Sequence, residues 1–142
     1  MPGLSSRIAV AAHILVFLAW RRGNLVASPE IARSVNTNPV VVRRIIGALR
    51  QAGLVEVQAG VAGGARLARS AAEITLLDAY RAVEVDALFS LHPQAPRREC
   101  SIGANIQDVL WPVFCQAQEA MEAVLGRVTV EDMGKGIASR CR

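Results

Sequence analysis

Two closely spaced helix-start signals constrain the fold of this chain most strongly. Ser28-Pro29 and Asn38-Pro39 each place a residue suited to capping a helix directly before a proline. Proline fits the first helical position because its missing N–H group would have no partner there. The short stretch between the two signals leaves room for one short helix and a turn at Asn36-Thr37. The pattern therefore predicts two helices joined by a tight turn.

The second of these helices has one apolar face and is followed by a hairpin. The spacing typical of a helix predicts an inward face made of Val42, Ile45, Ile46 and Leu49. Gly53 suits the left-handed position after a helix end. The alternating segment 54–58, the glycine-rich turn 60–64 and the return 65–69 then predict two short strands. We expect a mainly α fold with a small β-hairpin wing, which is a winged helix-turn-helix.

The exposed face of the second helix is the expected reader of DNA bases, since this helix lies in the major groove in such motifs. Its candidate residues are Asn38, Val40, Arg43 and Arg44, with Val41 divided between the two faces. Arginine pairs with guanine, asparagine with adenine, and valine contacts the methyl group of thymine. Residues 1–70 hold nine arginines against two glutamates, a net charge of +7, which favours a polyanionic partner. A solvated charged face is the alternative interpretation.

The hairpin is the expected contact to phosphates. Glycine removes the side chain that would hold a backbone N–H away from a phosphate. The candidate residues are Gly60, Gly63, Gly64, Arg66 and Arg69. A merely flexible turn explains the glycines alone, and the two neighbouring arginines favour the DNA contact.

Two further helices are expected to build a homodimer. Residues 8–20 are almost wholly apolar but number only thirteen, where a membrane span needs roughly 20, so we expect a first helix buried on all sides, with no membrane partner. A second seam repeats at spacings of four and three residues, typical of a coiled coil. Its members are Ile106, Leu110, Val113, Ala117, Ala120 and Val124. Pro112 lies inside this helix and is expected to kink it.

This organisation predicts four segments. Residues 1–85 form the DNA-binding domain, 86–101 a linker loop that is exposed and mobile, and 102–133 the dimerisation helix with a short terminal element. Residues 134–142 are expected to be a disordered tail, because glycines and a chain end favour fraying.

Several runs along the chain resemble the Rrf-two (Rrf2) family of transcriptional regulators. They are Ser28-Pro29-Glu30-Ile31-Ala32, Ala48-Leu49-Arg50-Gln51-Ala52-Gly53-Leu54-Val55, Gly63-Gly64-Ala65-Arg66-Leu67-Ala68-Arg69 and Ile74-Thr75-Leu76. The resemblance implies a homodimeric regulator, most simply a repressor, bound to a pseudo-palindromic operator in double-stranded DNA. It also implies a long C-terminal helix that packs on the partner's first helix. Ala59 stands where some members carry an arginine, which puts reading of the minor groove by the wing in doubt.

Cys100 is the candidate sensor. Cluster-binding members of the family carry three cysteines in the loop before the long helix, whereas this chain has only Cys100 there, with Cys115 on the helix and Cys141 near the end. An iron–sulfur cluster normally takes four protein ligands, so no cofactor is expected and a cluster shared across a dimer is the alternative. Arg97, Arg98 and the following helix start favour a reactive thiolate at Cys100. A cysteine that merely packs is equally compatible with the sequence, and the effector is not identified.

The sequence shows no signature of an enzyme. Carboxylates are scattered, no spacing of metal ligands occurs, and His13 lies in an apolar helix where we expect it to be packed. Three cysteines form no disulfide framework, which favours a reducing, cytoplasmic location. A protein-interaction module built on a winged-helix scaffold is the alternative function.

Overall fold

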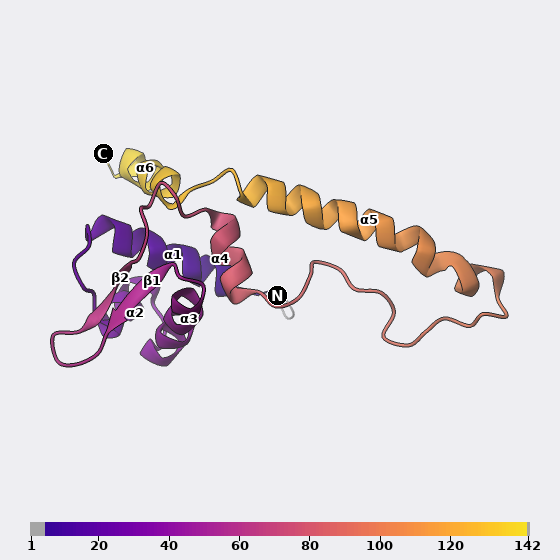
Figure 1. Ribbon diagram of the computed structural model, residues 1–142, viewed down its shortest axis with the longest axis horizontal. Coiled ribbons are helices and arrows are strands. Elements are labelled where there is room, and N and C mark those ends of the chain that lie inside the picture. The colour runs from indigo at the N-terminus through magenta and orange to yellow at the C-terminus, as the bar shows by residue number, and fades with distance from the viewer. Residues whose placement is uncertain (1–4, 142) are drawn as a thin grey trace. The chain divides into compact units, whose positions relative to one another are not determined.

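The computed structural model describes residues 5–141 (Figure 1). The described residues up to Glu84, together with those from Leu125 onward, form one compact unit, and Val85–Val124 form a second. The first unit contains α1 (Arg7–Trp20), α2 (Ser28–Val35), α3 (Pro39–Gln51), β1 (Val55–Gln58), β2 (Gly64–Leu67), α4 (Leu76–Val83) and α6 (Val130–Arg140). The expected fold class, mainly helical with a small hairpin, is confirmed.

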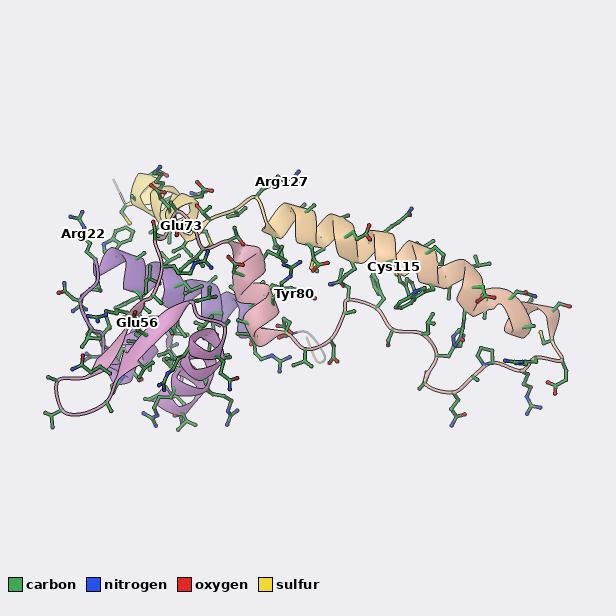
Figure 2. All side chains as sticks on the ribbon, viewed as in Figure 1. Arg22, Glu56, Glu73, Tyr80, Cys115 and Arg127 are labelled. Carbon is green, nitrogen blue, oxygen red and sulfur yellow. The ribbon has the colours of Figure 1, made fainter. Side chains whose placement is uncertain are left out.

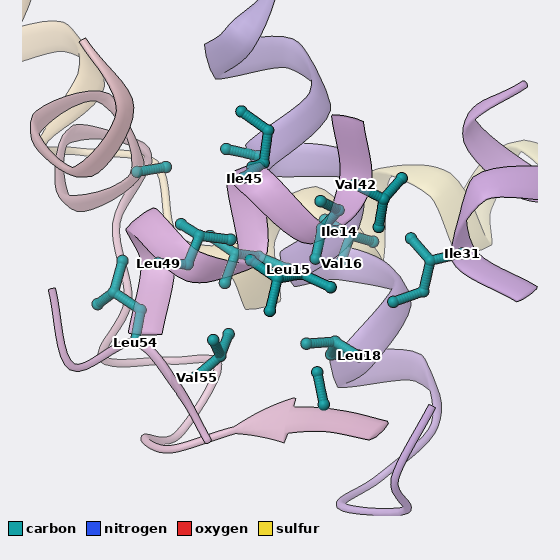
Figure 3. Close-up of a cluster of buried hydrophobic side chains, with 14 of the residues drawn as sticks. Ile14, Leu15, Val16, Leu18, Ile31, Val42, Ile45, Leu49, Leu54 and Val55 are labelled. Carbon is teal, nitrogen blue, oxygen red and sulfur yellow. The ribbon is translucent and has the colours of Figure 1, made fainter. Parts of the chain in front are cut away.

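The core of the first unit lies where α1 meets α2, α3 and the hairpin (Figure 3). The predicted inward face of α3 is confirmed, because Val42, Ile45, Ile46 and Leu49 are all buried. Ile14, Leu15 and Leu18 of α1 are buried against them. Burial of each such side chain stabilises the unit by about 1.5–3 kcal/mol. The expectation that α1 is buried on all sides is wrong, because Trp20 is 52% exposed.

The hairpin is antiparallel and is extended by a third segment. Val55 pairs with Leu67 and Gln58 with Gly64, while Val26 forms an isolated bridge with Ala65 through two backbone hydrogen bonds of 2.9 Å. A Cβ atom on Gly64 would lie 2.5 Å from the carbonyl oxygen of Val26. The absence of a side chain at Gly64 is therefore required by packing within the chain.

Two of the predicted helix ends are found in the structure, and one predicted cap is not. Gly53 has a φ of +78° after α3, and the amide of Leu54 donates to the carbonyl of Leu49 over 3.0 Å, as expected for a left-handed helix end. Asn38 caps α3, because its side-chain oxygen accepts from the amide of Val40. Ser28, which we expected to cap α2, is instead its first residue, and the capping position belongs to Ala27.

The C-terminal segment corrects the prediction of a disordered tail after residue 133. Helix α6 continues to Arg140, and Val130 at its start is fully buried in the first unit. Thr129 and Asp132 form a capping box that satisfies the free amides of the first turn. The apolar side chains of Val130 and Met133 pack against the core, which holds the helix despite its two glycines.

The second unit consists of α5 (Ser101–Leu125) and the preceding segment Val85–Cys100, which we call the strap. Helix α5 runs through Pro112 to Leu125, and Figure 1 shows it as one element. The strap was expected to be a mobile linker. It is anchored on α5 by Phe89 and Phe114, whose ring centroids lie 5.2 Å apart, and by a 2.9 Å hydrogen bond from the amide of Leu88 to Gln118.

Candidate nucleic-acid interface

The exposed face of α3 is positioned by the turn that follows α2. Asn36 adopts a left-handed conformation, with φ of 63°, and the amide of Thr37 returns to the carbonyl of Ala32 over 3.0 Å. The buried face of α3 then leaves Arg43 and Arg44 exposed, with Val40 49% exposed beside them. Basic and apolar groups therefore stand together on the outer face of the second helix of the motif.

Two details of this face differ from the expectation. The side-chain oxygen of Asn38 accepts a hydrogen bond of 2.8 Å from the amide of Val40, so capping of α3 competes with a base for this oxygen. Val41, which helical periodicity places between the two faces, is 37% exposed and belongs to the outer face.

Gly47 is a residue of this face that the sequence analysis missed. It lies one helical turn after Arg43 and Arg44, and a Cβ atom there would meet nothing within 4 Å. Glycine in a helix interior costs about 0.5–1 kcal/mol relative to alanine, and nothing within the described chain requires it here. The sequence signal for this residue is a glycine inside the predicted helix, between the apolar positions of residues 42–49.

The hairpin places the predicted phosphate contacts in different environments. The Nε atom of Arg66 lies 3.1 Å from a carboxylate oxygen of Glu56, which Figure 2 labels on the hairpin. Arg69 donates to the carbonyl of Glu73 over 3.2 Å. Both arginines are exposed, but the positive charge of Arg66 is partly neutralised by a neighbour that the sequence analysis did not consider.

The tip glycines also separate into two kinds. Gly60 has a φ of +105° and open space around it, so a backbone approach from outside is unobstructed. A Cβ atom on Gly63 would lie 2.0 Å from the carbonyl oxygen of Gln58. Gly63, like Gly64, is thus required by the hairpin itself, and its presence gives no separate support for a phosphate contact.

The apolar side chains of α5 include the predicted seam and extend beyond it. No residue of α5 is buried within the described chain. Of the predicted seam, Val113, Ala120 and Val124 are exposed, and Ile106, Leu110 and Ala117 are half-buried. Ile102 and Val109, which the prediction omitted, are 74% and 65% exposed. The apolar stripe, whose members follow the same helical spacing and are exposed except for the half-buried Ile106 and Ala117, comprises Ile102, Ile106, Val109, Val113, Ala117, Ala120 and Val124.

Cys100 is the capping residue of α5, since its carbonyl accepts from the amide of Ala104 over 2.8 Å. Hydrogen bonds from the backbone amides of Gly103 and Ile102 lower the pKa of its exposed thiol. The two arginines that the sequence suggested as the cause, Arg97 and Arg98, do not contribute to this shift. Cys115 is half-buried on α5 (Figure 2) and Cys141 is exposed.

His13 is not packed as we expected. It is exposed, and its Nε2 atom lies 2.8 Å from the hydroxyl oxygen of Ser34 on α2. Across residues 5–141, no three His, Cys, Asp or Glu side chains are grouped so that they could hold a metal ion. Within the same range, no helix is both long enough and apolar enough to cross a lipid bilayer.

The two-helix motif, its basic outer face and the glycine-tipped hairpin define a winged helix-turn-helix DNA-binding protein. The sequence model of the Rrf2 family, described as iron-dependent transcriptional regulators, matches residues 4–136. The chain therefore belongs to the Rrf2 family and is a DNA-binding transcriptional regulator.

Individual relatives agree with this assignment. The chain is 42% identical over 131 residues to YwnA of Bacillus subtilis (strain 168), named as an HTH-type transcriptional regulator, covering 92% of this chain and 96% of YwnA. A crystal structure described as that of a DNA-binding protein is 41% identical, with a TM-score of 0.73, over 90% of this chain and 98% of the other. A transcriptional regulator from Lactobacillus plantarum is 26% identical with a TM-score of 0.79, over 95% and 91% of the two chains.

Proposed function

We propose that the protein is a repressor that binds a pseudo-palindromic operator as a homodimer. The outer face of α3 supports this proposal most directly, because it presents Arg43 and Arg44 together with Val40 and Gly47, free of contacts within the described chain that would cover them. Two copies of such a helix, one DNA turn apart, read two half-sites of a palindrome.

The apolar stripe of α5 supports the dimer. Large apolar side chains in a row along an exposed helix face are typical of a protein–protein interface. The stripe repeats every three or four residues, which matches the packing of one helix along another. We therefore assign Ile106, Val113, Ala117, Ala120 and Val124 to the interface, with Ile102 and Val109 added and Leu110 at its edge.

The test is binding of the purified protein to the DNA upstream of its own gene, measured by gel shift together with sedimentation. A dimer that shifts this DNA, and an Arg43→Ala, Arg44→Ala double variant that remains dimeric without shifting it, are the expected results. A wild-type protein that is dimeric and binds no DNA would favour the interaction-module alternative.

We further propose that Cys100 makes the regulator responsive to thiol oxidants. The observation behind it is an exposed sulfur whose pKa is lowered by two backbone amides at the start of α5, since the thiolate is the form that oxidises. The thiolate of Cys100 would attack one oxygen of a hydroperoxide and break the O–O bond. The sulfur is oxidised by two electrons to a sulfenic acid, and the other oxygen takes up a proton and leaves as an alcohol or water. Operator affinity before and after mild peroxide should change in the wild type and stay constant in Cys100→Ser. Equal responses in both proteins would exclude this thiol.

An iron–sulfur cluster receives less support. The described residues of one chain bring no three candidate ligands together, and Cys100 is the one cysteine of the strap. A cluster would therefore need ligands from both copies of a dimer. Iron content and the visible absorption spectrum of anaerobically purified protein test this alternative directly.

A further inference from the structure

An ion pair stands on the outer face of the hairpin. Glu56 on β1 and Arg66 on β2 are direct partners in the antiparallel register, and Nε of Arg66 lies 3.1 Å from Oε2 of Glu56. Successive side chains of a strand point to opposite faces. Val55 and Ala65, which precede the two residues, are both buried. The ion pair therefore projects away from the core and into solvent.

Glu56 is the one acidic residue among residues 39–69, which contain α3 and the hairpin. The same range has five arginines, namely Arg43, Arg44, Arg50, Arg66 and Arg69. A carboxylate on a surface that meets DNA opposes binding, because the phosphates carry the same charge. A neutral side chain at this position would allow tighter binding to any DNA. Affinity therefore does not explain a glutamate here.

Stability of the fold does not explain it either. Both side chains of the pair are about half exposed, at 45% for Arg66 and 56% for Glu56. Ion pairs in such positions add little to the free energy of unfolding, because water screens the charges and the two side chains lose freedom. Replacing either residue should therefore leave the hairpin folded, so that effects on DNA binding are measured by themselves.

The carboxylate of Glu56 holds the guanidinium group of Arg66 by one edge. The hydrogen bond uses the Nε–H group, so the four N–H groups on Nη1 and Nη2 are not used by this pair. The guanidinium is planar and rigid, and holding one edge fixes the direction of the other. The second edge has the geometry to donate two hydrogen bonds to one phosphate.

We propose that the Glu56–Arg66 pair makes DNA binding selective, because it offers a phosphate contact of fixed direction without adding net charge to the hairpin. On the operator, base contacts from α3 fix the register, and the held guanidinium meets a phosphate. On unrelated DNA nothing fixes the register, and binding depends on net charge, to which the neutral pair adds nothing. Glu56 is a positioning residue that acts through Arg66. This inference rests on the proposed function, in which α3 reads an operator.

The Glu56→Gln variant separates charge from geometry, since glutamine keeps the shape of glutamate and its carbonyl oxygen accepts the same hydrogen bond. The hairpin gains one positive charge. Affinity for unrelated duplex DNA should rise several-fold, and the slope of log affinity against log salt concentration should steepen by about one. Operator affinity should rise less, because Arg66 already meets its phosphate there. The ratio of the two affinities should therefore fall.

The double variant Glu56→Gln, Arg66→Gln restores a neutral hairpin without the guanidinium. Its affinity for unrelated DNA and its salt slope should match the wild type, whereas its operator affinity should fall several-fold. Glu131→Gln is the matched control, since it removes a carboxylate from an exposed ion pair with Lys135 on α6, away from the hairpin turn (Figure 1). Both affinities should stay at the wild-type values in this control.

The operator in these titrations is the upstream DNA of the gel-shift test, and a scrambled duplex of equal length and composition is the unrelated DNA. Wild-type affinity for the scrambled duplex and an unchanged salt slope in Glu56→Gln would overturn the proposal. So would a loss of operator affinity with a changed base preference, because Glu56 would then contact a base itself. Failure of the proposed function is seen in the wild type alone, as equal affinity for the two DNAs.

Discussion

Thr75 and Thr129 are partners in an antiparallel β-bridge, and each begins a helix with the same capping box. The amide of Val130 donates to the carbonyl of Ile74, and the amide of Leu76 donates to the carbonyl of Val128, each over 2.8 Å. The starts of α4 and α6 are thereby joined side by side. This bridge and the buried Val130 hold the end of the chain on the first unit.

The capping box of α6 should make that attachment weaker in acid. Hydrogen bonds from the amide and hydroxyl of Thr129 lower the pKa of Asp132. A carboxyl whose folded pKa is lowered stabilises the fold above its unfolded value, and this contribution disappears as pH falls through the folded value. We expect Asp132→Asn to be less stable than the wild type at neutral pH, with the difference shrinking as the pH falls below the ordinary pKa of an aspartate, about 3.9. Urea unfolding across this range measures it, and a difference independent of pH would contradict it.

Arg43 and Arg69 should affect DNA binding in different ways. Replacing Arg43 with alanine would remove the proposed base contact, which should cost roughly 1–3 kcal/mol and relax the preference at one base pair. Replacing Arg69 with alanine would remove the proposed phosphate contact, so binding to all sequences should weaken alike and the salt slope should fall by about one. Titrations of operator and unrelated DNA at several salt concentrations separate the two. Unchanged affinity in both variants would refute the assignment of α3 as the reading helix.

Replacing Gly47 with alanine should raise the stability of the protein and lower its affinity for DNA. Alanine at this position should stabilise α3 by about 0.5–1 kcal/mol, because the helix no longer orders a glycine. The added methyl group would project from the face that we propose to approach DNA, so operator affinity should fall. Gly134→Ala on α6 is the matched control, since a Cβ atom there also meets nothing within 4 Å. Equal operator affinity in the two variants would show that α3 does not need close approach at Gly47.

Ala120→Glu should disrupt the dimer. The new carboxylate would be placed in the apolar stripe without a partner, and burying an unpaired charge is strongly unfavourable. We expect a folded monomer in sedimentation with greatly reduced operator binding. Ala104→Glu adds the same charge on the opposite face of α5 and should remain dimeric. A dimer from Ala120→Glu would exclude the stripe as the interface.

Elements whose signals are local could be predicted from the sequence. The apolar spacing in α3, the cap at Asn38 and the left-handed Gly53 each depend on residues within a turn or two of one another. The positions of Arg43 and Arg44 on the outer face follow from the same local pattern, because helical periodicity alone fixes which side chains oppose a buried face.

Contacts between distant segments could not be predicted from the sequence and are seen in the folded chain. The bridge between Thr75 and Thr129 holds α6 where the sequence predicted a disordered tail. The packing of Phe89 on Phe114 anchors the strap where the sequence predicted a mobile linker. The register of the hairpin paired Arg66 with Glu56. Local patterns do not reveal such contacts, because their energy comes from burying apolar surface and pairing polar groups that meet only when the whole unit has folded.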